Sequence, residues 1–398
     1  MLVFATTAAA AVANDEAHAR LTRALPTVDG VRFTCDPAQL DVLLPAMTAY
    51  LHLQGIDSSW ITRELDSQAG MVRYALTTSA SDTDTLSLSA RPEYAIHDEV
   101  VSLPVAGGKM REVATVSQKE IILALFQHGR LTEFPRSACN VEAFRDHVRA
   151  RQNIVAWAES LEWAWPNGGA ARWNKRYWNE GTPHPGVPVH AAVNDAFLNQ
   201  SSYAIGCYTA TKLLVEQGVL DYYHRVKKDS KTAAAISARL LADSEPLVNL
   251  EPGVMWDFET DYDTAETTRP GKLLRVQYGV APGNFVPGDW SYFLNTDAAS
   301  YEKTGYEGSN AVYLGRNRFD DYYNDNNHYY NYKEKLDEVW QWRHGVFSRS
   351  RDADKIQLLT AEELAILSKT PREGGLLQDF RVYPYFFGFE ALPKIPRL

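Results

Sequence analysis

A single cysteine at the start of an expected helix constrains this chain more than any other feature. The stretch Ser201–Gly218 has apolar residues at helical spacing after Cys207 and a glycine stop signal at its end. We therefore expect Cys207 in the first turn of a helix, where unpaired N–H groups and the helix dipole stabilise a thiolate. Gly206 places no side chain beside the sulfur, which leaves room for a substrate carbonyl. The alternative is that Cys207 is a small buried hydrophobic residue.

Length and composition describe a globular chain with room for two domains. It has 398 residues, of which 45% are hydrophobic and 23% charged, and it has no apolar run of about 18 residues that could span a bilayer. The formal net charge is −10, and no stripe of Lys and Arg interleaved with aromatic residues offsets it. We expect neither a membrane protein nor a nucleic-acid partner.

The three cysteines and the N-terminal stretch indicate in which cellular compartment the protein is expected. Cys35, Cys139 and Cys207 are too few and too scattered for a disulfide framework, and no CxxC pair suggests zinc. This favours a reducing compartment or a thiol that is kept reduced. The apolar stretch from Leu2 to Ala13 resembles a signal-peptide core but lacks a preceding Lys or Arg, so a short first helix is the alternative. The expected locations are cytoplasmic or spore-associated, with a secreted form possible.

The first half of the chain predicts helices and one hairpin. Apolar spacing predicts a helix between Thr34 and Gly55, and alternation predicts a hairpin from Met71–Thr78 and Thr85–Ala90. A capped helix is expected over Ser117–Gly129, with Ser117 and Glu120 at capping-box spacing, and a long helix over Asn140–Trp165. No chemical constellation stands out before about residue 108, so this part is either a substrate-recruiting or regulatory module or a packing extension.

The second half changes from helices to short strands. Pro183–His190 is expected to be a loop and Thr232–Ala242 a helix. The β-prone runs that follow are Met255–Phe258, Leu273–Tyr278, Trp290–Leu294 and Ala311–Leu314. Strands that follow a Cys-bearing helix predict an α+β fold in which an antiparallel sheet packs on that helix, as in papain-like enzymes.

Several stretches in order resemble the spore-coat type of bacterial transglutaminase. The matching segments are Asn153–Ala156, Tyr203–Ala210, Pro287–Phe293, Gly308–Gly315 and the helix from Lys333 to Gly345. The resemblance covers about residues 140–350. It implies a papain-like, NlpC/P60-like cysteine enzyme without metal or cofactor, whose thiolate attacks a protein glutamine, releases ammonia and passes the acyl group to a lysine. On this interpretation the protein has an accessory region 1–115, a catalytic domain 116–350 and a C-terminal extension 351–398, and its partners are protein substrates.

The chain departs from the family at two positions that bear on proton transfer. The family has Glu directly before the nucleophile and Glu within its GxN strand, whereas this chain has Gly206 and Ser309. Two replacements for the missing base are expected, Glu307 two positions before Ser309 and His328 in the Tyr/Asn-rich loop. Asp289 is interpreted as a structural turn residue. The residues expected to bind substrate are Tyr203, Gly206, Trp290, Tyr306, Ser309 and Asn310.

Three functions remain open at this point. The first is an acyltransferase that forms isopeptide crosslinks between glutamine and lysine. The second is a glutamine deamidase or amide hydrolase with the same nucleophile, and the third is an inactive scaffold. Retention of Cys207 beside a glycine favours activity, and the many Trp and Tyr residues are compatible with water-excluding walls that favour transfer over hydrolysis.

Overall fold

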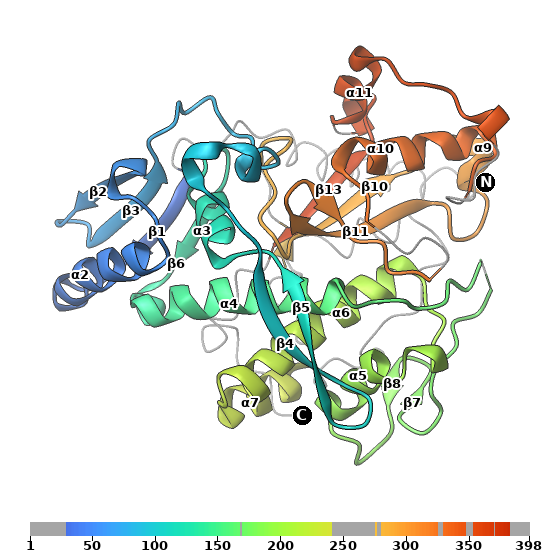
Figure 1. Cartoon of the computed structure of the whole chain (residues 1–398), viewed down its shortest axis with the longest axis horizontal. Helices are drawn as coiled ribbons and strands as arrows, with labels where there is room; N and C mark the ends of the chain where they lie inside the picture. The colour runs from blue at the N-terminus through green and yellow to red at the C-terminus, as the bar shows by residue number, and fades with distance from the viewer. Residues whose placement is uncertain are drawn as a thin grey trace, which may run out of the picture.

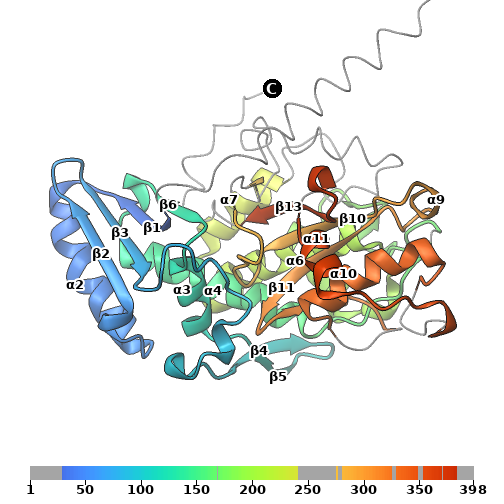
Figure 2. The same ribbon diagram turned by 90° about the horizontal axis from the view of Figure 1, so that it is seen from above.

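Two mixed layers of helix and sheet meet along a pair of central helices. The computed structural model describes residues 29–167, 169–240, 275–276, 280–324, 329–347, 353–369 and 371–382. The central pair is α4 (Val141–Ala158) and α6 (Cys207–Asp221), which cross the middle of the molecule (Figure 1). The N-terminal sheet lies on one side of this pair and the C-terminal sheet on the other, as both views show (Figures 1 and 2).

Among the described residues, helices cover one face of the N-terminal sheet. Its strands are β1 (Gly30–Thr34), β2 (Ile61–Asp66), β3 (Met71–Leu76) and β6 (Leu131–Phe134), in the order β2-β3-β1-β6 with only β1 and β6 parallel. Phe33 and Tyr74 alternate into the core with the helices α2 (Pro37–Leu53) and α3 (Gln118–Phe126), while Arg32 and Arg73 form ion pairs on the other face. The period-2 pattern thus fixes which face meets the helices.

The C-terminal sheet presents one face to α6 and the other to α10 (Tyr332–Gln341). Its order is β12-β11-β10-β13-β9, and every neighbouring pair is antiparallel. Its strands are β9 (Arg275–Val276), β10 (Trp290–Leu294), β11 (Gly308–Gly315), β12 (Arg318–Phe319) and β13 (Leu377–Val382). Phe293 and Phe319 pack towards α10, and Val312 packs towards α6. The structure confirms a mixed α+β fold.

Smaller elements complete the described chain. The hairpin β4 (Glu99–Val105) and β5 (Lys109–Thr115) lies against α4, and a two-stranded ribbon precedes α5. The remaining elements are β7 (Trp178–Asn179), β8 (Thr182–Pro183), α5 (Val189–Leu198), a π-helical turn (Tyr222–Val226), α7 (Ser230–Leu240), α9 (Ala298–Tyr301), α11 (Ala361–Leu367) and short 3-10 turns. β13, which belongs to the expected C-terminal extension, is an interior strand of the C-terminal sheet. The three-part domain division stays a prediction.

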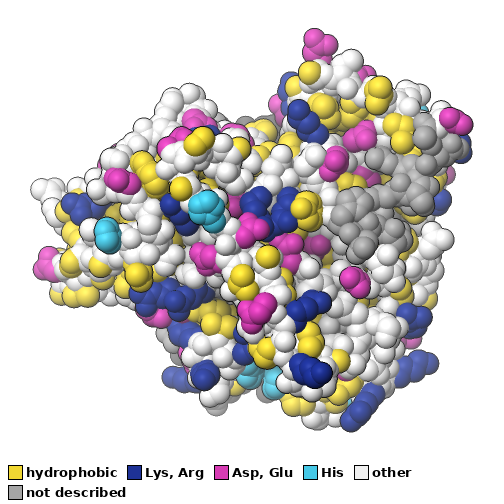
Figure 3. All heavy atoms as spheres, in the orientation of Figure 1, with side chains coloured by type: hydrophobic (Ala, Val, Ile, Leu, Met, Phe, Trp, Pro, Cys, Tyr) yellow, Lys and Arg dark blue, Asp and Glu magenta, His cyan; other side chains and the backbone are white. Residues whose placement is uncertain are grey.

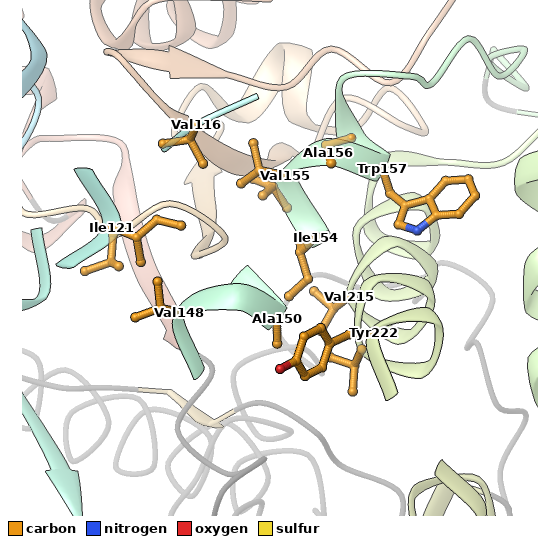
Figure 4. Close-up of a cluster of buried hydrophobic side chains, with 14 of the residues drawn as sticks. Val116, Ile121, Val148, Ala150, Ile154, Val155, Ala156, Trp157, Val215 and Tyr222 are labelled. Atoms are coloured by element: carbon orange, nitrogen blue, oxygen red, sulfur yellow. The ribbon is translucent and has the colours of Figure 1, made fainter. Parts of the chain in front are cut away.

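Most expected helices are present, with informative differences at their ends. The long helix stops at Ala158 rather than Trp165, because Trp163 instead forms a bridge with Tyr323. Helix α6 does not stop at Gly218 but continues to Asp221. Gly218 is needed there for another reason: a Cβ atom at this position would lie 2.4 Å from Cγ1 of Ile154 on α4. Figure 4 shows Ile154, Val215 and Tyr222 gathered where the two helices meet.

The predicted hairpin is wrong in its second strand. Met71–Leu76 is a strand, but it pairs with β2, and Thr85–Ala90 is an irregular segment with a 3-10 turn at Leu88–Ala90. The reason is that Thr85 binds a distant chain segment: its hydroxyl donates to the carbonyl of Phe285 at 2.7 Å. A contact across 200 residues overrides the local alternation.

A disulfide joins Cys35 to Cys139, contrary to the expectation from the scattered cysteines. Their Cα atoms are 5.4 Å apart although 104 residues separate them in sequence. Pairing of β1 with β6 brings these positions together, because Cys35 follows β1 and Cys139 follows β6 within a few residues. Disulfides persist mainly in oxidising compartments. The location of the protein stays a prediction.

The surface carries charges of both signs. Lys and Arg side chains are interspersed with Asp and Glu on the face in Figure 3. Across the described ranges, the structure contains no helix with the length and apolarity needed to cross a membrane. The prediction that nucleic acid is not a partner stays a prediction. The expected N-terminal apolar segment, the run Met255–Phe258 and His328 lie outside the described residues.

Glu120 makes the stability of the fold depend on pH. Its side chain is buried and accepts a 2.6 Å hydrogen bond from the backbone N–H of Arg316, which ties α3 to the β11–β12 turn. In the expected capping box, the N–H of Glu120 donates to the hydroxyl of Ser117, and this bond forms. The Glu120 carboxylate accepts from Arg316 instead of from the N–H of Ser117. Burial raises the pKa of Glu120 to about 8 from an ordinary value of 4.5. The folded state therefore favours the protonated carboxyl.

We expect Glu120→Gln to remove this pH dependence. Protonation of Glu120 contributes stability that is complete below pH 4.5 and is lost as the pH rises towards 8. Glutamine keeps the acceptor for Arg316 without the buried charge. In urea unfolding, the variant should gain at least about 1 kcal/mol relative to the natural protein between pH 5 and pH 8. A parallel loss of stability in both proteins over this range would contradict the prediction.

Candidate active site

Cys207 occupies the first position of α6, as its sequence context predicts. Gly206 is the N-cap residue with extended backbone (φ −78°, ψ 166°), and the thiol lies outside the disulfide and is half-buried. The sulfur therefore sits beside the N–H groups of the first turn, where the helix dipole favours a negative charge. This is the position in which a thiol ionises readily.

Asn310 on β11 binds the sulfur directly. Its Nδ2 donates to Sγ of Cys207 at 3.4 Å, and its Oδ1 accepts from Nε1 of Trp290 at 2.8 Å. An indole N–H can only donate, so Trp290 turns the amide oxygen to itself and leaves the amide N–H for the sulfur. Trp290 in turn packs against Tyr208, the residue after the cysteine. The orientation of the donor is thus fixed by β10 and α6 together.

Gly308 brings the backbone of β11 close to the sulfur. Its carbonyl lies 4.0 Å from Sγ of Cys207. A Cβ atom on Gly308 would lie 2.0 Å from the hydroxyl of Tyr292 on the paired strand. Glycine at this position therefore leaves the space beside the cysteine that the ring of Tyr292 occupies.

The sulfur opens into a cavity of about 510 Å³ between α6, the edge of the C-terminal sheet and α10. Its walls include the aromatic rings of Trp165, Tyr306, Trp342 and Phe347, with Tyr306 packed edge-on against Trp342 and Phe347. Three carboxyl groups, those of Asp320, Asp321 and Glu338, also line it, together with Lys303 and Lys335. The cavity therefore combines rings that exclude water with acidic groups near a thiol.

Asp320 is the most deeply buried of these carboxyl groups. It follows β12, and its N–H donates to the carbonyl of Val312 across the sheet. Its Oδ2 has no hydrogen-bond partner among the described residues. Burial, with added repulsion from Asp321 and Glu159, raises the pKa of Asp320 well above its usual range, and Lys335 opposes the shift. A buried carboxyl with a raised pKa, in a cavity beside a thiol, is a candidate for proton transfer.

A hydrogen-bonded chain ties this segment to the first turns of α6. The hydroxyl of Tyr322 lies 2.7 Å from Oγ1 of Thr211, and Thr211 donates to the carbonyl of Cys207 at 2.7 Å. Because Tyr322 is two residues after Asp320, the same extended segment that carries the carboxyl is anchored to the helix that carries the thiol.

The structure brings some of the expected site residues together and not others. Tyr306, Ser309 and Asn310 line the cavity with Cys207. Glu307 is not among the described residues that line it, and its backbone carbonyl accepts from Asn295. Tyr203 is buried elsewhere and donates its hydroxyl to Asp195. The roles expected for Glu307, for His328, which is not described, and for the substrate-binding residues stay predictions.

Asp320 and Asp321 were missed in the sequence. An Asp-Asp pair next to Tyr residues is usually a solvated turn, and nothing local distinguishes this one. The available signal was the apolar context, since Phe319 and Tyr322 flank the pair and both are buried. In the described ranges, no group of three or more His, Cys, Asp or Glu residues is arranged to hold a metal ion.

Comparison with known proteins gives the family. The model of the protein-glutamine gamma-glutamyltransferase family matches residues 106–325, a span that contains Cys207, Asn310 and Asp320. Among solved structures, the chain is similar to a transglutaminase from Geobacillus stearothermophilus without its C-terminal extension, at 21% identity and a TM-score of 0.38, over 65% of this chain and 97% of that one. A search of curated proteins gave no match. Because the family model spans more than half of the chain, the protein belongs to the protein-glutamine γ-glutamyltransferases, the transglutaminases that transfer a glutamine acyl group to an amine and so crosslink proteins.

Proposed function

We propose that Cys207 carries the acyl group in this transglutaminase. Its thiolate attacks the side-chain carbonyl carbon of a protein glutamine, the C–N bond breaks and ammonia leaves with a proton. The amine of a lysine then attacks the thioester, the C–S bond breaks, and Sγ recovers its electron pair. The observation that supports this assignment is the position of Sγ, at a helix N-terminus, 3.4 Å from the amide N–H of Asn310 and open to the cavity.

We assign the proton transfers to the carboxyl of Asp320. It shares the cavity with Cys207, it is almost fully buried, and one of its oxygens is without a hydrogen-bond partner among the described residues. It accepts the thiol proton, delivers it to the departing ammonia, and then removes a proton from the attacking lysine. In this chain Asp320 would replace the glutamates that the family has where Gly206 and Ser309 stand.

The cavity walls fit an amine as the second substrate. A lysine ammonium is attracted by the carboxylate of Asp321, whereas Glu338 is already paired with Lys335, and the ammonium must lose its proton before it attacks. The rings of Tyr306, Trp342 and Phe347 keep water away from the thioester, which favours transfer over hydrolysis. The helix packed on an antiparallel sheet around the thiol supports a papain-like core. The family match supports glutamine and lysine side chains of proteins as the substrates.

The test is a mass-spectrometric assay with two substrates. Purified protein is incubated with a glutamine-rich acceptor protein and a biotinylated primary amine, beside its Cys207→Ala variant. The expected product is the acceptor with the amine added and ammonia lost, formed only when Cys207 is present. Conversion of glutamine to glutamate without amine would instead show hydrolysis, and product formation by the variant would rule out Cys207 as the nucleophile.

A further inference from the structure

A second cavity lies in the N-terminal sheet, away from Cys207. It has a volume of about 540 Å³ and is enclosed by α2, the turn after it, β2 and β3. Leu51, Ile56 and Ile61 form its apolar part. Its polar lining comprises Arg63 and Tyr74 on adjacent strands, together with Thr48, His52, Asp57 and Ser58. In both views α2 and β2 lie at the end of the molecule opposite to α10 (Figures 1 and 2).

One rim of this cavity is a strand edge. In the order β2-β3-β1-β6, β2 is terminal, and among the described strands it pairs only with β3. The outer side of β2 therefore presents backbone N–H and C=O groups that another extended chain can pair with. Since side chains alternate along a strand, Ile61 and Arg63 face the cavity beside this edge. An edge strand next to a helix-lined cavity is a known arrangement for binding an extended peptide.

Among the polar side chains of the cavity, Arg63 and Tyr74 are available to a ligand. Tyr74 is 3% exposed, and its hydroxyl has no hydrogen-bond partner among the described residues. The pKa of Tyr74 is raised to about 12 by burial, so this hydroxyl keeps its proton and can donate. Arg63, which faces it across the pair of strands, forms no ion pair within the described ranges. Asp57 is already engaged by the N–H of Ser59. A carboxylate placed between Arg63 and Tyr74 would satisfy both groups.

We propose that this cavity is a docking site for an extended segment of the protein substrate. The segment adds to β2 as a fifth strand and places an acidic side chain on Arg63 and Tyr74. The identification of the partner as a substrate rests on the transglutaminase function. A crosslinking enzyme acts on whole proteins, and a docked segment raises the effective concentration of a nearby glutamine or lysine at Cys207 without any new contact there.

Binding can be measured without turnover, using a probe that contains neither glutamine nor lysine. The probe is a fluorescein-labelled octapeptide of alternating Thr and Val with one central Glu, titrated with the full chain and followed by fluorescence anisotropy. Arg63→Glu should weaken binding by about tenfold or more, and Tyr74→Phe by about threefold or more. The matched control is Arg111→Glu, an exposed arginine on the β4–β5 hairpin, which should leave the affinity unchanged.

Two altered probes test the geometry. A peptide with Lys in place of the central Glu should bind Arg63→Glu better than the natural protein, because the charges are then exchanged. A peptide N-methylated on alternate amides should bind at least about tenfold more weakly, because it cannot pair with β2. Absence of saturable binding, equal weakening by Arg111→Glu, or full binding of the N-methylated peptide would each overturn the proposal.

A substrate assay connects docking to activity. A short glutamine peptide is compared with the same peptide fused through a Gly-Ser linker to the octapeptide. The fused substrate should have a kcat/KM about tenfold or more higher, and Arg63→Glu should abolish this advantage while turnover of the short peptide stays unchanged. If neither peptide takes up amine while the anisotropy titration shows binding, the transglutaminase assignment fails and the docking site stands. Equal kcat/KM for the two peptides would refute substrate docking.

Discussion

The Asp320→Asn variant is expected to lower kcat/KM for amine incorporation by about 100-fold or more, the usual cost of losing a positioned general base. The substitution keeps the shape of the side chain and removes a buried negative charge that Asp321 and Glu159 repel. The fold should therefore survive, which circular dichroism and urea unfolding will check. What the variant loses is the carboxyl group that we propose as the acceptor of the thiol proton of Cys207, with which it shares the cavity.

The pH profile separates this role from a structural one. Because the pKa of Asp320 is raised by burial, the acidic limb of kcat/KM should lie above the range of an ordinary carboxyl group. In Asp320→Asn that limb should disappear, because the group whose ionisation produces it is gone. A variant that keeps the natural profile at a uniformly lower rate would argue that Asp320 has only a structural role.

The same assay compares the other candidates for the base. Asp321→Asn, Glu307→Gln and His328→Ala are measured beside Asp320→Asn at each pH. We expect Asp321→Asn mainly to raise the KM for the amine, because its carboxylate lines the cavity through which the amine enters. If Glu307→Gln or His328→Ala instead removes the acidic limb, the base is the residue expected from the sequence and not Asp320.

The position of Cys207 was predictable from the sequence because its environment is local. A glycine followed by Cys207 and helical spacing determines the helix start, and the structure places Cys207 at the first helical position. The burial of Asp320, the acid/base partner that we propose, was not predictable in this way. Whether Asp320 is solvated or buried depends on Val312, Tyr322 and α6, which are brought together only by the completed sheet. Sequence position alone does not report such burial.

The fold shows the same division between local and distant causes. Helix α2 and strand β10 follow from spacing and composition, and both are present. The contact of Thr85 with Phe285 and the disulfide between Cys35 and Cys139 join segments 200 and 104 residues apart, and neither has a local signal. Gly218 was interpreted from the sequence as a helix stop, but the structure shows that glycine is needed there because α4 approaches closely. That requirement comes from another element and cannot be seen in the local sequence.

The second large effect is expected at Asp289, which lies one residue before Trp290. Its carboxylate is fully buried and forms ion pairs with Arg130 at 2.6 Å and with Arg151 at 2.9 Å. It also accepts the N–H of Val286 at 2.8 Å. His147, whose pKa burial and the two arginines hold well below its usual range, stays neutral and accepts from Nε of Arg151. One carboxylate thus compensates two buried positive charges, in keeping with the structural role expected for this residue.

Asp289→Asn should therefore destabilise the fold by about 3–5 kcal/mol, because two guanidinium groups would remain buried without a counter-charge. Urea unfolding at neutral pH measures the loss. The matched control is Glu133→Gln, which breaks the exposed ion pair with Arg32 and should cost less than about 1 kcal/mol. Adding Arg130→Met to Asp289→Asn should recover part of the stability, since it removes one of the unpaired charges.

The loss should extend to the active site through β10. Asp289 fixes the start of the strand that carries Trp290, and Trp290 orients the amide of Asn310 towards Sγ of Cys207. In the fraction of Asp289→Asn that stays folded, we expect a lower rate of thiol alkylation by iodoacetamide at pH 7, because a less ordered Asn310 stabilises the thiolate less. If Asp289→Asn costs no more stability than Glu133→Gln and alkylation is unchanged, the buried ion pairs neither hold the fold nor position the thiol.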